Sequence, residues 1–189
     1  MPEPTESLTQ PPFPTIETAR LFLRALELSD AAELLHHFSD PELLKYLDFE
    51  PLEHLEDARG VIGWGQSLFA EGRGILWGLF ERQSGRLVGT LNLERKVSPH
   101  RAEITYDLAP DWWGQGLMPE AVQAVLPYVF DTLGIVRLET TVHMRNLRSI
   151  GVLLKVGFQL EGVLRAYKVF HGELADVFSF SLLAGDWRG

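Results

Sequence analysis

A glycine-rich turn between a predicted strand and a predicted helix is the part of the chain best suited to ligand binding. It covers residues 109–121, with the sequence APDWWGQGLMPEA. Gly114 and Gly116 carry no side chain, so the backbone can bend sharply and approach a bound group closely. The helix that follows begins with N–H groups that lack intrahelical partners and with the positive end of the helix dipole. Together these features predict a phosphate-binding site.

Two common phosphate-binding patterns do not fit this turn. No Gly-Lys-Ser/Thr follows the glycines, as a P-loop requires, and the third glycine of a dinucleotide fingerprint is missing. A glycine pair alone is equally compatible with a tight turn that binds nothing. The rest of the sequence must therefore decide between a binding loop and a plain turn.

Other reactive side chains form no recognisable catalytic set. The chain has no cysteine, which excludes disulfides, thiolate metal sites and cysteine nucleophiles. His36 and His37 are adjacent and point apart on a helix, while His143 and His171 are isolated. We expect all six histidines to be surface or loop residues, and we expect no metal site. No Ser/His/Asp nucleophile elbow is present.

The elements that must position the turn follow from hydrophobic periodicity. Alternating residues predict strands at 18–26, 75–81, 86–94, 103–108, 136–143, 158–169 and 175–183, and helical spacing predicts helices after Asp30 and Asp40 and at 55–70, 119–133 and 146–156. Asn146 is well placed as an N-cap. This order of elements predicts a mixed α/β protein of the α+β type, with helices packed against a sheet.

The composition is ordinary for a globular protein, with 46% hydrophobic and 23% charged residues. The length predicts one domain at 15–189, preceded by a flexible lead-in at 1–14 that lacks the features of a secretory signal. No apolar run approaches the ~20 residues needed to span a bilayer, so no membrane partner is expected. The net charge of −9 argues against nucleic-acid binding and weakly favours a cationic partner. A cytoplasmic location fits these features.

The turn and its neighbours resemble the GNAT superfamily of N-acetyltransferases, in particular its ribosomal-protein branch of the RimJ/RimL type. In the turn, the match is Trp113-Gly114-Gln115-Gly116 followed by Glu120-Ala121. Further matches follow in the family's order: IETARLFLRAL, DPELLKYL, RLVGTLNL, NLRSIGVLLKVGFQLEGVLR and DVFSFSLLAGDW. Asp111 departs from the Gln or Arg usual at its position, which affects one polar contact of the loop.

The resemblance implies the GNAT fold, a central, mixed, mostly antiparallel sheet of about seven strands that parts near the cofactor and has helices on both faces. It implies acetyl-CoA as co-substrate, with backbone N–H groups of 113–118 on the pyrophosphate and the strand 106–108 along the pantetheine arm. Asn146 would add an amide contact. The cofactor-binding residues expected on this basis are Tyr106, Asp107, Leu108, Trp113, Gly114, Gln115, Gly116, Leu117, Met118, Asn146 and Ser149.

Two residues are candidates for catalysis by the same resemblance. Glu103 begins the strand that leads into the turn, and a partly buried carboxylate there would take the proton of the amine through water. Many superfamily members protonate the leaving thiolate with a tyrosine four residues after the position of Ser149, but this chain has Leu153 there. Ser149 is the expected substitute, as a hydrogen-bond donor to the sulfur. A surface role for Glu103 and a purely capping role for Ser149 remain the alternatives.

The activity implied is direct transfer of an acetyl group to a primary amine in a ternary complex. The expected acceptor is a protein or peptide α-amine, which at a pKa of ~7.7–8.0 is roughly a tenth neutral at pH 7, whereas a lysine at ~10.4 is almost wholly charged. Small-molecule amines are the alternative acceptors, and a non-catalytic acyl-CoA-binding module is a further alternative. Acceptor choice is expected to lie in the acidic segment 38–70. An exposed closing strand such as 175–183 offers an edge for a homodimer.

Overall fold

The computed structural model describes residues 12–95 and 98–187. The strands are β1 (Ile16–Glu17), β2 (Leu21–Ala25), β3 (Gly74–Glu81), β4 (Leu87–Arg95), β5 (Arg101–Leu108), β6 (Arg137–His143), β7 (Gln159–Phe170) and β8 (Glu173–Leu183), and the helices are α1 (Ala31–His37), α2 (Pro41–Leu44), α3 (Leu55–Ala70), α4 (Leu117–Pro127) and α5 (Leu147–Val156). Within this part of the chain, no helix is long and apolar enough to cross a membrane.

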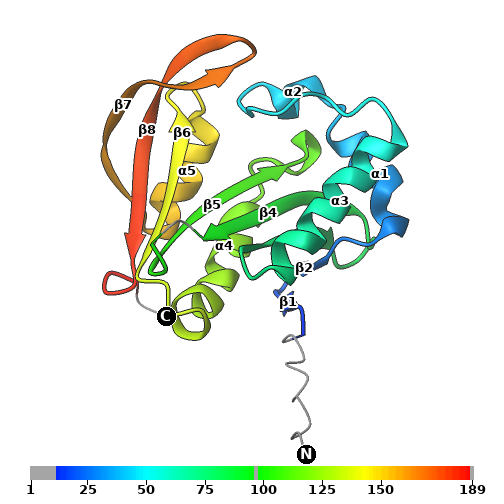
Figure 1. Cartoon of the computed structure of the whole chain (residues 1–189), viewed down its shortest axis with the longest axis horizontal. Helices are drawn as coiled ribbons and strands as arrows, with labels where there is room; N and C mark the ends of the chain where they lie inside the picture. Colours follow the sequence, from blue (N-terminus) through cyan, green and yellow to red (C-terminus); the bar gives the residue numbers. More distant parts are fainter. Residues whose placement is uncertain (1–11, 96–97, 188–189) are drawn as a thin grey trace, which may run out of the picture.

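The strands of the described residues form one open sheet of eight strands in the order β1-β2-β3-β4-β5-β6-β8-β7 (Figure 1). Among the strand pairs of the described residues, β5 and β6 run parallel and the others run antiparallel. The predicted mixed, mostly antiparallel sheet is therefore confirmed. The additional strand, β1, has only two residues and is too short to produce an alternating pattern in the sequence.

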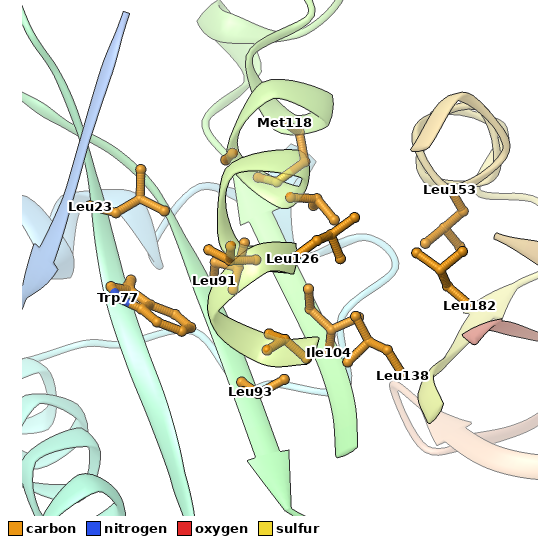
Figure 2. Packing of buried hydrophobic residues seen from close by; sticks show 14 of the residues in the cluster. Leu23, Trp77, Leu91, Leu93, Ile104, Met118, Leu126, Leu138, Leu153 and Leu182 are labelled. Atoms are coloured by element: carbon orange, nitrogen blue, oxygen red, sulfur yellow. The ribbon is translucent and has the colours of Figure 1, made fainter. Parts of the chain in front are cut away.

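Each face of the sheet packs against its own hydrophobic core, which confirms helices on both faces. On one face, Leu91 and Ile104 of the sheet meet Met118 and Leu126 of α4, with Leu153 of α5 nearby (Figure 2). On the other face, α1 and α3 lie side by side and cover β2, β3 and β4 (Figure 1). Alternate residues of β3 point into the two cores, as the strand period of two requires.

The helix after the glycine turn differs from its prediction at both ends. It begins at Leu117 rather than at residue 119, because Gly116 adopts the left-handed conformation at the N-cap, with φ of 78°. Near its end, Pro127 has no N–H to continue the α-helical bonding, and Tyr128–Thr132 form a π-helical turn. The α-helix proper is therefore shorter than the hydrophobic stripe that predicted it.

The predicted flexible lead-in extends too far toward the domain. Residues 1–11 of that lead-in lie outside the described part of the chain. Phe13 packs on Phe69 and Trp77, with ring centroids 5.0 and 6.3 Å away. The indole N–H of Trp77 donates to the carbonyl of Pro14 at 2.7 Å. Residues 13 and 14 thus belong to the folded domain rather than to the lead-in.

The prediction that 175–183 forms an exposed edge is wrong. This segment belongs to β8, which is hydrogen-bonded to β6 on one side and to β7 on the other. The last strand of the described residues enters the sheet between two earlier ones, so β7 rather than β8 forms the edge of the sheet at this end, with β1 at the other. Irregular pairing interrupts β7, and Ala166 within it has φ of 47°. Such irregularities hinder edge-to-edge pairing with a second chain.

Candidate active site

The parallel strands β5 and β6 part along most of their length. Their ladder joins residues 101–103 to residues 137–139 and ends there. Further along, β5 stays paired with β4 on its far side, and β6 stays paired with β8. Two backbone edges therefore face each other across an opening, which suits an extended ligand that pairs with a strand edge. The glycine turn begins where β5 ends.

The glycine turn places its backbone as a bound anion would require. Gly114 and Gly116 have φ of 74° and 78°, a conformation that other residues adopt only with strain. A Cβ atom at Gly114 would meet no heavy atom within 4 Å, so the space in front of this glycine is open. The first N–H groups of α4, from Leu117 and Met118, have no intrahelical acceptor.

Two side chains of the N-terminal region hold the turn. The carboxylate of Glu120 accepts hydrogen bonds from the Thr18 hydroxyl at 2.6 Å and from Arg20 Nε at 2.8 Å. Arg20 Nη1 also donates to the carbonyl of Gln115 at 2.8 Å. Burial would raise the pKa of Glu120, but the hydrogen bonds from Thr18 and Arg20 hold that pKa below its usual value. Glu120 is thus an ionised support of the turn.

Basic side chains gather around the turn, although the net charge of the whole chain is −9. A Cβ atom at Gly116 would lie 3.7 Å from Arg20 Nη2 and 4.0 Å from Lys155 Nζ. The guanidinium of Arg148 lies 4.5 Å from the centre of the Trp113 ring. Positive charge beside a helix N-terminus is the environment that a diphosphate needs.

The side chains of Trp113 and Gln115 close the turn on itself. Trp113 Nε1 donates to the carbonyl of Leu108 at 2.5 Å, and Gln115 Nε2 donates to the carbonyl of Asp111 at 2.9 Å. Both polar side-chain groups are therefore used inside the turn. The backbone N–H of Trp113 also donates within the turn, to the carbonyl of Pro110 at 3.1 Å, so the predicted contact of this N–H with a pyrophosphate is wrong. A phosphate contact of Gln115 would come from its backbone N–H.

Tyr106 of β5 reaches across the opening to α5. Its phenolic oxygen lies 3.0 Å from Ser149 Oγ and 3.3 Å from the carbonyl of the same residue. Burial raises the pKa of Tyr106, and the hydrogen bond with Ser149 offsets this only in part, so the phenol stays protonated. Asn146 caps α5 by accepting from the N–H of Ser149 at 3.2 Å, as predicted. Leu153, one turn further, is fully buried in the core.

Glu103 lies on the opposite face of β5 from Tyr106, because successive side chains of a strand alternate. Its neighbours in register are Glu94 on β4 and Glu139 on β6. Glu139 accepts a hydrogen bond from Arg101 at 2.7 Å, so part of this carboxylate charge is balanced. Along the strand, Glu103 and Tyr106 are about 10 Å apart. The two groups can therefore act on opposite sides of one transfer site but not on the same atom.

The prediction that all histidines lie at the surface or in loops is wrong for His37. This residue of α1 is buried, and its Nε2 lies 2.5 Å from Oδ1 of Asp107. Asp107 also accepts from the N–H and the hydroxyl of Thr90, at 3.0 and 2.5 Å. The side chain of Asp107 thus points to α1, away from the opening. Helical spacing was the usable signal, because His37 follows the buried Leu34 by three residues.

Aromatic residues border the far end of the opening. The ring of Tyr46, just after α2, lies 5.2 Å from His143, the last residue of β6. His143 in turn lies 5.0 Å from Phe170, the last residue of β7. Burial and the charge of Arg145 lower the pKa of His143, so its imidazole is neutral near pH 7. The acidic segment 38–70 therefore reaches the end of the parted strands, where α2 lies in Figure 1.

The parted strands β5 and β6 lead to the glycine turn and to a helix N-terminus with basic side chains nearby, an arrangement suited to a long phosphate-bearing ligand. The model of the GNAT acetyltransferase domain matches residues 20–159. The chain belongs to this family and is an acetyltransferase.

Relatives extend over nearly the whole chain. An uncharacterized N-acetyltransferase of Bacillus licheniformis, p20, is 38% identical over 176 residues, which cover 93% of this chain and 99% of p20. The ribosomal protein uS5-alanine N-acetyltransferase of Escherichia coli is 27% identical over 182 residues, which cover 91% of this chain and 92% of that protein. Among solved structures, the ribosomal L7/L12 α-N-protein acetyltransferase RimL in complex with coenzyme A has a TM-score of 0.82 at 23% identity, covering 90% of this chain and 98% of RimL. This last likeness establishes the fold alone.

Proposed function

We propose that this protein moves the acetyl group of acetyl-CoA to a primary amine, and that the acceptor is the N-terminal α-amine of a protein or peptide. The observation that carries the proposal is the continuity of the open edge of β5 with the glycine turn and the N-terminus of α4. Along this path, the edge of β5 would pair with the amide-containing pantetheine arm. At its end lies an anion-binding site with basic side chains nearby.

The residues along the path fit an acyl-CoA. The backbone N–H groups of 114–118 would bind the diphosphate, because the N–H of Trp113 already donates to the carbonyl of Pro110 at 3.1 Å. Lys155 supplies positive charge beside Gly116, where Arg20 also lies, paired with Glu120. The backbone of 106–108 lies on the opening between β5 and β6, where it would pair with the pantetheine amides. When bound, acetyl-CoA supplies the acetyl group as a thioester, which an amine can attack.

We further propose that Ser149 stabilises the leaving sulfur and that Tyr106 supports it. In this proposal the phenol of Tyr106 donates to Ser149 Oγ, which lies 3.0 Å away, so that the serine proton can point into the opening. A serine hydroxyl is a weak acid, so the role proposed is hydrogen bonding to the negative sulfur rather than full proton transfer. Many family members have a tyrosine at the position of Leu153, and the pair of Tyr106 and Ser149 would take over the role of that tyrosine.

On the other face of β5, Glu103 is proposed to accept the proton of the amine through a water molecule. Glu103 and Tyr106 lie on opposite faces of β5, about 10 Å apart along the strand, so the base and the support of the sulfur would act from opposite sides of the acetyl group. Holding both substrates in line would supply much of the rate. An α-amine needs little help from a base, because part of it is neutral at pH 7.

A protein N-terminus is favoured as the acceptor by the Escherichia coli relative at 27% identity, whose name gives ribosomal protein uS5 as its substrate. A cytoplasmic location belongs to the same proposal, because ribosomal proteins reside there. The carboxylates of Glu94 and Glu103 and the acidic segment 38–70 would attract a cationic amine to this side of the sheet. Small-molecule amines are the alternative acceptors, and the test must distinguish them from peptide α-amines.

The test is an acceptor screen that measures thiol release from acetyl-CoA and identifies the product by mass spectrometry. Peptides with a free N-terminus are compared with the same peptides carrying a blocked N-terminus, and with polyamines and amino acids. Turnover that requires the free α-amine supports the proposal. Turnover on small amines alone would move the assignment to the alternative. Tight coenzyme A binding without turnover on any amine would indicate a non-catalytic module.

A further inference from the structure

The buried pair of His37 and Asp107 lies beside the proposed path of the acyl-CoA and has no part in the chemistry described above. The side chains of His37 and Asp107 are only 3% and 8% exposed. Asp107 is the direct neighbour of Tyr106 in the segment 106–108, whose backbone is proposed to pair with pantetheine. Its carboxylate links that segment to Thr90 on β4 and to His37 on α1.

This linkage matters because β5 has lost one of its two neighbours at this point. After residue 103 the ladder to β6 ends, so within the described residues β4 is the strand that pairs with 104–108, and Trp113 Nε1 adds a bond to the carbonyl of Leu108. Adjacent side chains then anchor the strand in opposite directions. Tyr106 reaches α5 across the opening, whereas Asp107 reaches α1 on the far face.

We propose that His37 is a positioning residue for the acyl-CoA arm, and that it acts through Asp107 to hold the backbone of 106–108 at the right distance from β6. This inference rests on the proposed function. Without the imidazole, the carboxylate would keep only its bonds to Thr90 while remaining in a buried place. Burying an incompletely paired carboxylate is costly, so Asp107 would turn toward water and shift the strand.

The structure offers a place for such a shift. A pocket of about 320 Å³ lies between α1 and the residues that follow β5, and His37 forms part of its wall together with Glu33, His36, Arg86, Asp111 and Trp112. A displaced Asp107 side chain can move toward this pocket, and small molecules from solvent can reach the place of a deleted imidazole. Chemical rescue by free imidazole is therefore feasible at this site.

A merely structural role, in which the pair only ties α1 to the sheet, makes a different prediction. The helix is also held by the buried Leu34 and by Phe38, which pack in the core with Phe80 of β3. Loss of one polar bond should then reduce stability without a selective effect on either substrate. A positioning role should instead weaken binding of acetyl-CoA and spare binding of the amine.

The experiment compares His37→Gly with His36→Ala, a matched change of the neighbouring histidine, which is exposed and lines the same pocket. Steady-state kinetics would give kcat and the KM for each substrate. Calorimetry would give the Kd of coenzyme A, and thermal melting would show whether each variant is folded. For His37→Gly we expect the KM for acetyl-CoA and the Kd to rise about tenfold, or about 1.4 kcal/mol, with kcat and the amine KM within about twofold. Imidazole should restore most of the loss, and His36→Ala should resemble wild type.

Two further variants keep the inference testable if His37→Gly does not fold. His37→Gln retains an N–H donor for Asp107, so its KM for acetyl-CoA should stay near wild type, whereas His37→Leu, which has no donor, should raise it. A folded variant without a donor but with unchanged KM and Kd overturns the inference, as does an equal loss in His36→Ala. These outcomes differ from failure of the proposed function, in which the wild-type protein itself would not bind coenzyme A.

Discussion

The phenolic oxygen of Tyr106 and the hydroxyl oxygen of Ser149 lie 3.0 Å apart, although one residue belongs to β5 and the other to α5. Their bond spans the opening left where β5 and β6 part. Asn146 fixes the same end of α5 by accepting from the N–H of Ser149. A hydroxyl pair is thereby held between the two walls that would enclose a thioester.

Replacing Ser149 with Ala should lower kcat about tenfold to a hundredfold, because a hydrogen bond to the leaving sulfur is lost. The N–H bond to Asn146 remains in this variant, so the helix cap is preserved. Tyr106→Phe should lower kcat less, and the double variant should be little worse than Ser149→Ala, because both changes remove one interaction. Tyr128→Phe, at a partly buried tyrosine that packs on Trp77, is the control. If Ser149→Ala had the kcat of the wild type, Ser149 would have no role in catalysis and would serve only at the capped end of α5.

Replacing Gly116 with Val should abolish most coenzyme A binding. A β-branched residue is strained at φ of 78°, and its Cβ would lie 3.7 Å from Arg20 Nη2. The matched control is Gly85→Val in the turn between β3 and β4, where φ is 70° and no atom lies within 4 Å. Both changes should cost roughly 1–3 kcal/mol of stability from backbone strain. Only the change at Gly116 should raise the Kd of coenzyme A, by at least about tenfold, when measured by calorimetry. Equal Kd values in the two variants would rule out the glycine turn as the binding loop.

Glu103→Gln should lower kcat/KM mainly below the pKa of the amine. Below that pKa most of the amine is charged and needs a base, whereas above it the neutral amine reacts without one. At pH 7 we expect a loss of about tenfold or more that shrinks as pH rises. Glu94→Gln changes the neighbouring carboxylate in register and should leave the shape of the pH–rate profile unaltered. The same profile in Glu103→Gln and in wild type would remove Glu103 from the mechanism.

Acid should destabilise the protein partly through Glu161 at the edge of the sheet. Its hydrogen bonds with Arg137 lower the pKa of Glu161 to about 2. The unfolded chain takes up this proton near pH ~4.3, so between about pH 4.3 and 2 the unfolded state binds more protons and stability falls as pH falls. The side chain is 40% exposed, so solvent screening limits the effect to about 1 kcal/mol or less. Urea unfolding at pH 6 and at pH 3 should show a smaller drop for Glu161→Gln than for wild type. Equal drops would contradict this role.

The amino-acid sequence alone determined the features that depend on near neighbours in the chain. Helix α3 occurs at the predicted residues 55–70, because apolar spacing and a terminal glycine are local signals. Asn146 caps α5, and Gly114 and Gly116 take left-handed φ values, because both properties belong to single residues in a short segment. The mixed sheet likewise follows from the order of strands and helices.

Only the tertiary structure decided which distant residues meet. Strand alternation tells which side chains share a face but not which strand lies beside which, so β8 proved to be inside the sheet. The bonds from His37 to Asp107 and from Tyr106 to Ser149 join residues that are 70 and 43 positions apart. Such contacts leave no periodic trace in the sequence, because they depend on how whole elements pack. The left-handed glycine turn could therefore be predicted from local chemistry, whereas the contacts that hold β5 to α1 and α5 could not.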